Sequence, residues 1–321
     1  MDIAFGPVPS RRLGRSLGIN NIPPKHCSYS CLYCQVGPTH RPEVVPRAFH
    51  APEEIRRQVA QRLEAVGKRG ERVDYLTFVP DGEPTLDSRL NDAIRGLRDL
   101  GLPIAVISNA SLIWRPEVRD ALMGADWVSL KVDSVREAAW RQVNRPHGEL
   151  ELEAILEGIR SFAHAYRGIL VSETMLVEGL NDAATAIAEL GHFLADTGFK
   201  RTYLAVPIRP PAIAGTRGPD EAVLTRIHQQ WTALGLDVEL LAGPEGEDFA
   251  FTGDLERELL AITAVHPLRQ SGLDGLLRKA GADRGRVEAL LRDGHLKQVA
   301  YAGETFYVRA LAHPDNEASS P

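Results

Sequence analysis

The chain has 321 residues, of which 44% are hydrophobic and 25% are charged, and its formal net charge is −6. These values are typical of a globular protein that is long enough to bury a sizeable core. The mild negative charge argues against a strong electrostatic grip on nucleic acid. The sequence has no run of about 18 apolar residues that would span a membrane, and its first residues lack the apolar stretch of a signal peptide. We therefore expect a cytoplasmic protein without membrane association.

Strand and helix patterns alternate through most of the chain. Runs rich in β-branched and aromatic residues predict strands at 16–22, 73–79, 103–109, 127–133, 168–176, 201–208 and 237–241. Apolar residues at helical spacing predict helices at 52–68, 87–99, 116–123, 135–142, 150–166, 182–196 and 219–235. Such alternation is typical of βαβ units around a parallel sheet. We predict an α/β fold whose core, residues 1–245, is a partial (βα)6 TIM-like barrel, with 1–26 irregular apart from the first strand.

A second, smaller unit is predicted beyond a segment rich in Gly, Pro and acidic residues at 242–254. Three short helices are expected at 254–264, 271–280 and 284–293, followed by a hairpin over 296–309 that turns at Ala302-Gly303. This order predicts a winged-helix-like domain over 254–310, which could recruit a nucleic acid, a peptide or a protein, or serve only as a structural appendage. The remaining residues, 312–321, have the composition of a disordered tail.

All three cysteines fall in one short segment, as Cys27, Cys31 and Cys34. An odd, clustered set is not a disulfide framework, and thiolates are soft ligands suited to iron–sulfur clusters, zinc or copper(I). Three thiolates can hold three irons of a [4Fe–4S] cluster and leave the fourth open, whereas ferredoxin-type clusters use four cysteines. The alternative is a structural zinc site completed by His26 or His40, although such sites usually pair two ligand clusters.

Two motifs carry a resemblance to the radical SAM superfamily, namely CSYSCLYC at 27–34 and GEP at 82–84. The resemblance implies that the three cysteines hold a [4Fe–4S] cluster whose open iron binds S-adenosyl-L-methionine (SAM). It also implies an external electron donor and reductive cleavage of SAM to a 5′-deoxyadenosyl radical that abstracts hydrogen from a substrate. Segments 5–20 and 177–182 resemble an uncharacterised branch of iron–sulfur oxidoreductases and, distantly, wybutosine-type tRNA-modifying members. The resemblance covers about residues 5–240.

The resemblance also assigns residues to the cofactor. It places Tyr33 beside the adenine and the GEP motif at the amino group of the methionine moiety. Gly82 allows close approach of the backbone, Pro84 fixes the turn, and Glu83 offers an acceptor for an ammonium group. The alternative is a simple turn after a strand. Because functional residues of βα barrels follow the strands, the position after the second strand favours a cofactor site.

Polar residues at the ends of the next two strands extend this prediction. Asn109 ends the third strand, where family members often carry a polar residue that contacts the cofactor, although Asn can equally cap or turn the chain. Lys131 and Asp133 lie two residues apart and so on one face of the fourth strand. Since charges inside a barrel need partners, they form either a site near the cofactor carboxylate or substrate, or an internal Lys–Asp pair.

Four arginines are candidates for binding an anionic group of the substrate, which guanidinium groups do through paired hydrogen bonds. Arg11 and Arg12 precede the cysteines, Arg145 lies in the loop 144–147, and Arg209 ends the sixth strand. The substrate itself, a tRNA, a peptide or a small molecule, is not named by the sequence. The rival hypothesis is a zinc- or cluster-containing nucleic-acid-binding regulator without catalysis, which the winged-helix pattern would suit.

Overall fold

Eight strands form one large sheet in which each strand pairs with the next strand along the chain. The structure is a computed structural model and describes residues 2–243 and 246–310. The strands are β1 (Ala4–Ser10), β2 (Gly14–Ile19), β3 (Tyr75–Phe78), β4 (Ile104–Ser108), β5 (Trp127–Lys131), β6 (Ile169–Met175), β7 (Arg201–Ala205) and β8 (Val238–Leu241). Strands β2 to β8 are parallel. In the described residues, β2 to β8 match the seven strands predicted from the sequence, which is one parallel strand more than a (βα)6 barrel has.

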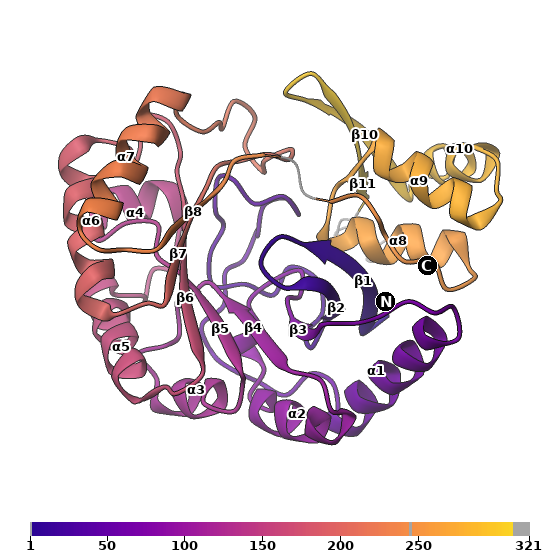
Figure 1. Ribbon diagram of the computed structural model, residues 1–321, viewed down its shortest axis with the longest axis horizontal. Coiled ribbons are helices and arrows are strands. Elements are labelled where there is room, and N and C mark those ends of the chain that lie inside the picture. Colours follow the sequence, from indigo (N-terminus) through magenta and orange to yellow (C-terminus); the bar gives the residue numbers. More distant parts are fainter. Residues whose placement is uncertain (1, 244–245, 311–321) are drawn as a thin grey trace, which may run out of the picture.

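Helices follow the strands and cover the outer side of the curved sheet (Figure 1). They are α1 (Pro52–Gly67), α2 (Leu90–Leu97), α3 (Pro116–Leu122), α4 (Glu137–Asn144), α5 (Leu152–Ala165), α6 (Ala184–Thr197) and α7 (Glu221–Ala233). Local signals start several of them. Proline occupies the first turn of α1 and α3, where its missing N–H costs nothing. The Asp220 side chain accepts a hydrogen bond from Val223 N at 2.8 Å and so caps α7. The predicted alternation of strands and helices is confirmed.

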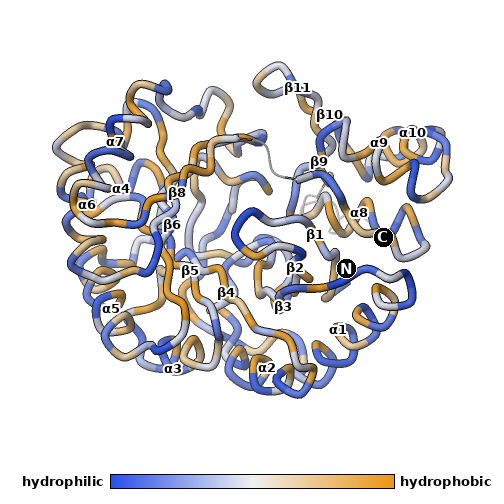
Figure 2. The backbone as a smooth tube through the Cα atoms, viewed as in Figure 1, coloured by the Kyte–Doolittle hydropathy of each residue, from blue (hydrophilic) through white to orange (hydrophobic). Residues whose placement is uncertain are grey.

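The two faces of the sheet pack against different apolar clusters, because successive side chains of a strand point to opposite faces. In β4, Ile104 and Val106 belong to the large core beneath the outer helices. Ala105, between them, belongs to a small inner cluster that also contains Ala205 and Tyr203. In Figure 2 the central strands are mostly hydrophobic, while hydrophilic stretches run along the outer helices. The inner face at the carboxyl ends of the strands is where a cavity opens, described below.

The first strand was not predicted. Residues 4–10 form β1, which pairs antiparallel with β2, whereas the sequence indicated an irregular lead-in. The strand is rich in Gly and Pro, which have low β-propensity, and its register is interrupted between Phe5 and Val8. The pairing is fixed instead by packing, because the Phe5 ring fills the space above Gly18. A Cβ atom at Gly18 would lie 2.0 Å from that ring.

The remaining described elements form a second layer of structure beside β1 (Figure 1). They are α8 (Leu255–Val265), β9 (Leu268–Arg269), α9 (Gln270–Ala280), α10 (Gly285–Arg292), β10 (Leu296–Tyr301) and β11 (Glu304–Arg309), and we call them the C-terminal module. The strands form an antiparallel sheet in the order β10-β11-β9. The three helices and the hairpin were predicted, and the hairpin turns at Ala302 and Gly303, which both have positive φ. The two-residue strand β9 was not predicted.

The module has its own apolar cluster, which includes Leu259, Leu273 and Tyr307, and it also packs on the barrel. Ala261 and Ala264 of α8 contact Phe5 in a separate cluster. The predicted tail, 312–321, lies outside the described residues. Within 2–243 and 246–310, no helix combines the length and the apolar character that crossing a membrane requires.

Candidate active site

The carboxyl ends of parallel strands meet at one edge of a sheet, and the predicted site residues come from that edge. The cysteine loop, residues 27–34, follows β2, and the GEP motif follows β3. Asn109 comes directly after β4, and Lys131 is the last residue of β5. Four successive strands therefore bring these residues to the same end of the barrel.

The cysteine loop is held by the end of α4. Ser30 N donates to Asn144 O at 3.1 Å, and Leu32 N donates to Val143 O at 2.9 Å. Backbone hydrogen bonds of this kind give an irregular loop the partners that it would otherwise find in secondary structure. The spacing of the three cysteines is thus fixed by a segment more than 100 residues further along the chain.

Side-chain amides point at two of the three sulfurs. Asn109 Nδ2 lies 3.5 Å from Cys27 Sγ, and Asn144 Nδ2 lies 3.5 Å from Cys31 Sγ. Donors at this position stabilise a ligating thiolate and tune a bound metal centre. All three cysteines are free thiols of intermediate exposure, Cys34 included.

The environment of the thiols disfavours their ionisation unless a cation is present. Burial raises the pKa of each thiol, and raises that of Cys31 to about 12 with a further contribution from the Asp133 carboxylate. Such thiols become thiolates when a metal supplies positive charge. Among the described residues, no three His, Cys, Asp or Glu side chains are arranged to hold a single metal ion. Three soft thiolates, two of them with an amide donor, are ligands that suit an iron–sulfur cluster.

Asp133 is the centre of a buried hydrogen-bond network. Its Oδ2 accepts hydrogen bonds from the Tyr33 hydroxyl and from Asn144 Nδ2, the latter at 2.6 Å, and its Oδ1 accepts one from Met175 N at 2.8 Å. Burial and the neighbouring carboxylate raise the pKa of Tyr33, so its hydroxyl keeps its proton. Both Asp133 oxygens have donors, and hydrogen bonds buried at low dielectric are strong, so the bond to the Tyr33 hydroxyl holds the Tyr33 ring in place. Lys131 Nζ lies 4.7 Å from the centre of that ring.

Lys131 has its ion pair across the sheet. Its Nζ lies 2.9 Å from Oε1 of Glu173, the residue opposite it on β6. Arg12 pairs with the other oxygen of the same carboxylate. Asp133 is occupied by amide and hydroxyl donors, so the internal Lys–Asp pair considered from the sequence is not what the structure shows.

The GEP motif packs directly against the residue that precedes the cysteines. Glu83 N donates to His26 O at 2.9 Å, and a Cβ atom at Gly82 would lie 2.1 Å from that same oxygen. No side chain fits in this space, which explains the glycine in physical terms. The structure shows close approach of Gly82 to His26, directly before the cysteine loop. The close approach to the cofactor expected from the sequence stays a prediction.

The Glu83 carboxylate is used within the protein. It accepts hydrogen bonds from Thr85 N at 3.1 Å and Thr85 Oγ1 at 2.6 Å, from Ser108 Oγ at 2.7 Å and from Asn109 N at 2.7 Å. It therefore caps the short 3-10 helix Pro84–Leu86 and ties it to the end of β4. Glu83 is 1% exposed. The sequence analysis expected the Glu83 carboxylate to be open to an ammonium group. In the structure this carboxylate already accepts four hydrogen bonds from the protein.

A cavity of about 270 Å³ opens at this end of the barrel, and Cys27, Tyr33, Cys34 and Gly82 lie in its wall. Its charged lining consists of Arg11, Arg12, Lys25, Lys131, Arg209, Asp81 and Glu173. Three of the four arginines predicted to contact substrate are in this wall. The fourth, Arg145, ends α4 in the left-handed conformation with φ of 47° and is exposed.

Asp81 is a cavity residue that the sequence analysis did not single out. It is 2% exposed, and neither of its carboxylate oxygens accepts a hydrogen bond from a described residue. Lys25 Nζ lies 3.6 Å from its Oδ1. Burial raises the pKa of Asp81 to about 6. Its place directly before the GEP motif was the signal that could have identified it.

Arg209 is held by partners from two distant segments. Its Nη1 donates to Gln35 Oε1 at 2.8 Å, and its Nη2 lies 3.1 Å from His266 Nε2. Gln35 follows Cys34 directly and also donates to Val265 O at 2.7 Å. Val265 lines the cavity, so the C-terminal module supplies part of the wall. Nothing in the sequence indicated this contribution.

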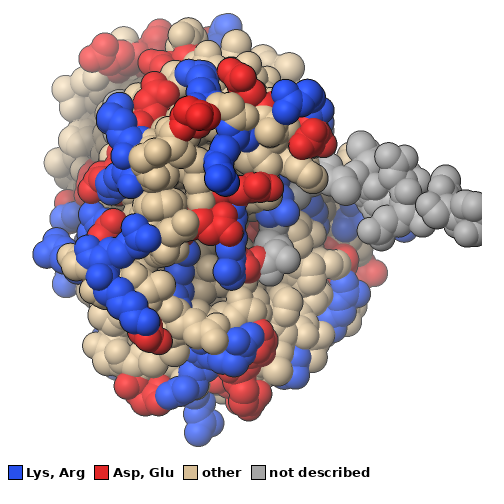
Figure 3. Space-filling model, turned by 90° about the vertical axis from the view of Figure 1, so that its right-hand side faces the viewer, with Lys and Arg blue, Asp and Glu red and all other residues tan. Residues whose placement is uncertain are grey.

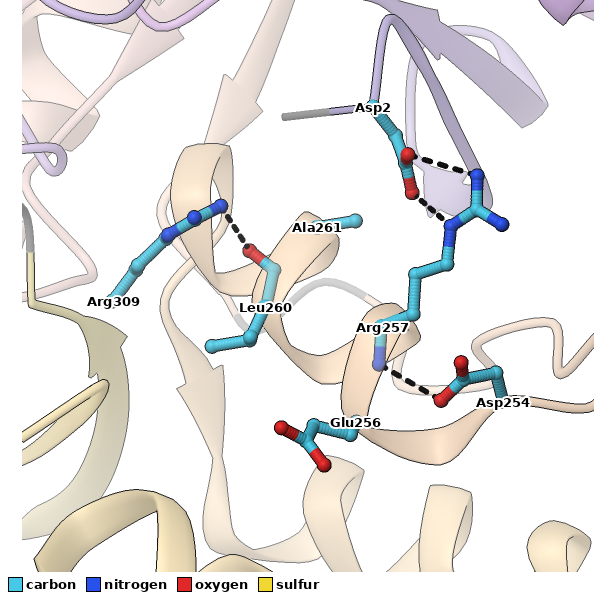
Figure 4. Close-up of a pocket in the computed structure, with 7 residues that line it drawn as sticks. All are labelled: Asp2, Asp254, Glu256, Arg257, Leu260, Ala261 and Arg309. Carbon is cyan, nitrogen blue, oxygen red and sulfur yellow. Dashed lines mark hydrogen bonds and ion pairs between the residues drawn. The ribbon is translucent and has the colours of Figure 1, made fainter. Parts of the chain in front are cut away.

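A second hollow, shown in Figure 4, lies where the N-terminal segment meets α8. In it the Arg257 guanidinium is forked onto the Asp2 carboxylate, with Nη2 to Oδ1 at 2.8 Å, and Arg309 reaches Leu260 O at 3.1 Å. The contact between Arg257 and Asp2 docks the module on the N-terminal segment, whereas the contact between Arg309 and Leu260 lies within the module. The residues that line this hollow include no Cys or His, and we do not assign chemistry to it.

Comparison with known proteins identifies the family. The family model described as the radical SAM superfamily matches residues 21–190, which include the cysteine loop and the GEP motif. The chain belongs to the radical SAM superfamily. A UPF0026 protein of Methanocaldococcus jannaschii is 43% identical over 323 residues, which cover 100% of both chains. A UPF0026 protein of Helicobacter pylori strain J99 is 32% identical over 230 residues, covering 70% of this chain and 72% of its own.

A solved structure supports the fold. The radical SAM methyltransferase from Sphaerobacter thermophilus superposes with a TM-score of 0.56 at 15% identity, covering 71% of this chain and 66% of its own. This likeness concerns the TIM-like barrel alone. As a member of the radical SAM superfamily the chain is an enzyme, and the family implies SAM and a [4Fe–4S] cluster as its cofactors.

Proposed function

We propose that Cys27, Cys31 and Cys34 hold a [4Fe–4S] cluster and that the neighbouring cavity binds SAM and substrate. The observation that carries this proposal is that Cys27, Cys34 and Tyr33 line one cavity at the carboxyl ends of the strands. When bound and reduced by an external donor, the two cofactors supply a 5′-deoxyadenosyl radical that abstracts hydrogen from the substrate. The protein supplies binding, orientation and exclusion of water.

The residues around the cysteines have separate tasks in this proposal. The amides of Asn109 and Asn144 donate to sulfur and stabilise the ligating thiolates. Asp133 holds the Tyr33 ring at the cavity wall, where it can pack against a flat group such as adenine. Gly82 keeps the turn after β3 against the cysteine loop.

We further propose that the acceptor for the amino group of SAM is Asp81 rather than Glu83. Asp81 lines the cavity and its oxygens accept no hydrogen bond from the described part of the chain, whereas Glu83 has four internal donors. A carboxylate near an ammonium group gains a charge-assisted hydrogen bond. Pro84 starts the 3-10 helix that positions both residues.

The test is anaerobic reconstitution with iron and sulfide, followed by reduction, addition of SAM and mass spectrometry of 5′-deoxyadenosine. We expect the wild-type protein to bind close to four irons and to cleave SAM, because a [4Fe–4S] cluster with one open iron is the proposed centre. Cys31→Ala should lose the cluster and the product together. Met123→Ala, a change at a partly exposed position on the end of α3, is the matched control and should retain both.

A purified protein with one bound zinc and no SAM cleavage under reducing conditions would contradict the proposal. It would favour a nucleic-acid-binding regulator with a closed metal site, and salt-dependent DNA binding would then be the next measurement.

We also propose a division of the chain into a catalytic unit, residues 1–245, and a winged-helix-like unit, residues 254–310. The support is the element order of the C-terminal module and its separate apolar cluster. Some of its cationic side chains have anionic or polar partners within the protein: Lys279 Nζ lies 2.6 Å from Asp248 Oδ1, and Arg284 bonds to Gln270 Oε1 at 2.7 Å. On the face in Figure 3, Lys and Arg are interspersed with Asp and Glu. A nucleic-acid reader would present a clear positive face, so we propose that the module completes the enzyme.

A further inference from the structure

Two large apolar side chains are exposed on loops that an arginine joins. Val45 is 68% exposed and Trp114 is 39% exposed. The Arg115 guanidinium lies 4.7 Å from the centre of the Trp114 ring, and its Nη2 donates to Val44 O at 3.4 Å. We call Val45, Trp114 and Arg115 the Val45–Trp114 patch. Single exposed apolar residues are normal on a protein surface, whereas Trp and Arg gathered beside an aliphatic side chain are typical of the centre of a protein interface.

Both loops of the patch contact Cys27, one of the proposed cluster ligands. Glu43 N donates to Cys27 O at 2.9 Å, and Val45 follows two residues later, so its Cα lies within about 8 Å of the Cα of Glu43. Asn109 Nδ2 lies 3.5 Å from Cys27 Sγ, and the same loop continues to Trp114. The patch is therefore carried by the two loops that contact the first of the three cysteines.

The patch is separate from the cavity in which SAM and substrate are proposed to bind. Cys27 lines that cavity, whereas no residue of the patch is among the described residues of its wall. Cys27 thus contacts both the cavity and the loops of a solvent-exposed patch. A partner bound at the patch would leave the cavity open to its own ligands.

The proposed reaction requires an electron from outside the protein. In this step a donor loses one electron and the proposed cluster gains it, and no covalent bond forms or breaks. Electron transfer becomes steeply slower with distance, so a donor protein has to bind where little protein separates it from the cysteines. Electron-transfer complexes are transient and bury less surface than most specific interfaces, so a small patch is sufficient.

The charge of the loops restricts the partner further. Loops 35–51 and 109–115 contain three arginines and one glutamate, although the whole chain has a formal net charge of −6. A further acid, Glu117 in α3, pairs with Arg115 at 3.2 Å. Even with this acid the arginines are in excess, and Arg41 is exposed. An acidic partner is therefore repelled by the chain as a whole and attracted to these loops. A second copy of the chain fits less well, because a twofold contact would place the arginines of the patch against their own copies.

We propose that the Val45–Trp114 patch, with Arg41 in the same loop as Val45, is the docking surface of a one-electron donor protein whose own contact surface is acidic. The inference rests on the proposed function, because it assigns a surface to the partner that would reduce the proposed cluster. The same two loops then contact Cys27 and receive the donor.

The first measurement detects docking at Trp114 itself. All four tryptophans lie in the described part of the chain, and the other three, Trp127, Trp140 and Trp231, are at most 4% exposed. The full chain, reconstituted with iron and sulfide, is labelled with 5-fluorotryptophan and mixed with oxidised flavodoxin or oxidised ferredoxin, two acidic proteins that donate single electrons. With at least one of them, we expect the fluorine resonance that is missing from Trp114→Phe to shift and the other three to stay unchanged.

The second measurement is the rate at which the reduced donor protein reduces the cluster, followed by absorbance in stopped flow. Val45→Glu and Arg41→Glu should each slow this reduction about tenfold, since an unfavourable charge at an interface lowers the association rate, and added salt should slow the wild type. Reduction by dithionite, a small molecule that needs no docking surface, should be unchanged. The matched controls are Leu240→Glu, at a 41% exposed apolar position in β8, and Arg226→Glu, at an exposed position in α7.

Two results would overturn the inference. One is the absence of a Trp114 shift with either donor protein, and the other is equal donor-dependent reduction in Val45→Glu, Arg41→Glu and their controls. A wild-type dimer that Val45→Glu abolishes, together with unchanged reduction by the donor, would assign the patch to a second copy of the chain instead.

Dithionite separates this inference from the proposed function. If the wild-type protein forms no cluster that dithionite can reduce, the proposed function fails, and a donor-induced shift of Trp114 that Val45→Glu abolishes would still support the docking surface. If dithionite supports SAM cleavage and every variant accepts electrons from the donor protein at the same rate, only the docking surface fails. Because Val45 and Arg41 are exposed, their variants keep the test valid if a change at the partly buried Trp114 disturbs its loop.

Discussion

Asn144 places its side-chain nitrogen 3.5 Å from Sγ of Cys31 and, with the same amide group, 2.6 Å from Oδ2 of Asp133. One buried residue therefore connects a proposed metal ligand to the network that fixes the Tyr33 ring. Because α4 ends at Asn144, the position of this helix is coupled to the electronic surroundings of the proposed cluster.

Replacing Asn144 by Ala should make the cluster harder to reduce. Loss of one donor to sulfur, worth about 1 kcal/mol, corresponds to a reduction potential lower by about 40 mV for one electron. A redox titration followed by electron paramagnetic resonance measures the shift. Asn181→Ala is the matched control, because Asn181 is equally buried and bonds to Asp133 O at 2.8 Å and to Met175 O, not to sulfur. An equal shift in both variants would show that general loosening of the site, not the bond to sulfur, sets the potential.

Gly82→Ala should disturb the cysteine loop without touching a cysteine. The new Cβ would lie 2.1 Å from His26 O, so backbone must move, and we expect a loss of about 2–4 kcal/mol in the free energy of unfolding. Iron content after reconstitution should fall as well. Gly96→Ala is the control, since nothing lies within 4 Å of its Cβ position in α2, and there alanine should stabilise the helix by up to about 1 kcal/mol. Normal iron content and stability in Gly82→Ala would contradict the close contact.

Asp81→Asn should change how the stability of the metal-free protein depends on pH. The pKa of Asp81 is raised to about 6 from the ordinary 3.8, so the folded state favours the protonated form. This contribution to stability is complete below about pH 3.8 and is lost as the pH rises through 6. Between pH 4 and 7 the free energy of unfolding of the variant should therefore rise relative to that of the wild type, by up to about 3 kcal/mol. Urea unfolding at a series of pH values measures this difference. Asp99→Asn, at an exposed ion pair, should change the free energy of unfolding little across this pH range. A difference for Asp81→Asn that is constant with pH would remove the basis of this prediction.

Glu83→Gln separates the internal role of this carboxylate from a role in binding the cofactor. A glutamine amide cannot accept all four hydrogen bonds and leaves a buried donor facing Ser108 or Asn109, so the free energy of unfolding should fall by about 2–4 kcal/mol. The affinity for SAM, measured by equilibrium dialysis on folded holoprotein, should fall less than it does in Asp81→Asn. The reverse order of affinities would return the ammonium-binding role to Glu83. Glu157→Gln, on the surface of α5, controls for the loss of charge.

The sequence predicted most of the fold because its signals are local. Helices that start with proline or a capping aspartate, such as α1 and α7, begin within two residues of the prediction. The exception is β1, which contains two prolines and a glycine and is recognised only through its tertiary partner Gly18. Strand β9 was missed for a related reason, since two residues are too few to carry a pattern.

The residues of the proposed site could be predicted where they lie together in a sequence motif. They could not be predicted where only the packing of the folded chain brings them together. The spacing of the cysteines and the glycine of the GEP motif were sufficient to place the site at the ends of β2 and β3. The choice between Asp81 and Glu83 depends on which side chain turns inward, and no pattern of spacing contains that information. The contact of His266 with Arg209 joins residues from the barrel and the C-terminal module, and only the folded chain brings them together.

The strictly sequential order of the large sheet has a consequence for synthesis of the protein. Each strand pairs with one made just before it, so the sheet can grow as the chain leaves the ribosome, without waiting for a distant partner. Early contacts of the cysteine loop can form once His147 has emerged, since its N–H donates to Ser28 O at 2.9 Å, while Ile213 N, which donates to Leu32 O at 3.1 Å, comes later. Val265, which is part of the cavity wall, follows 118 residues later, roughly 6–24 s at about 5–20 residues per second. During that interval the nascent chain exposes the proposed cluster-binding loop in an open, incomplete barrel, which would give the machinery that delivers iron and sulfide access before the module covers the site.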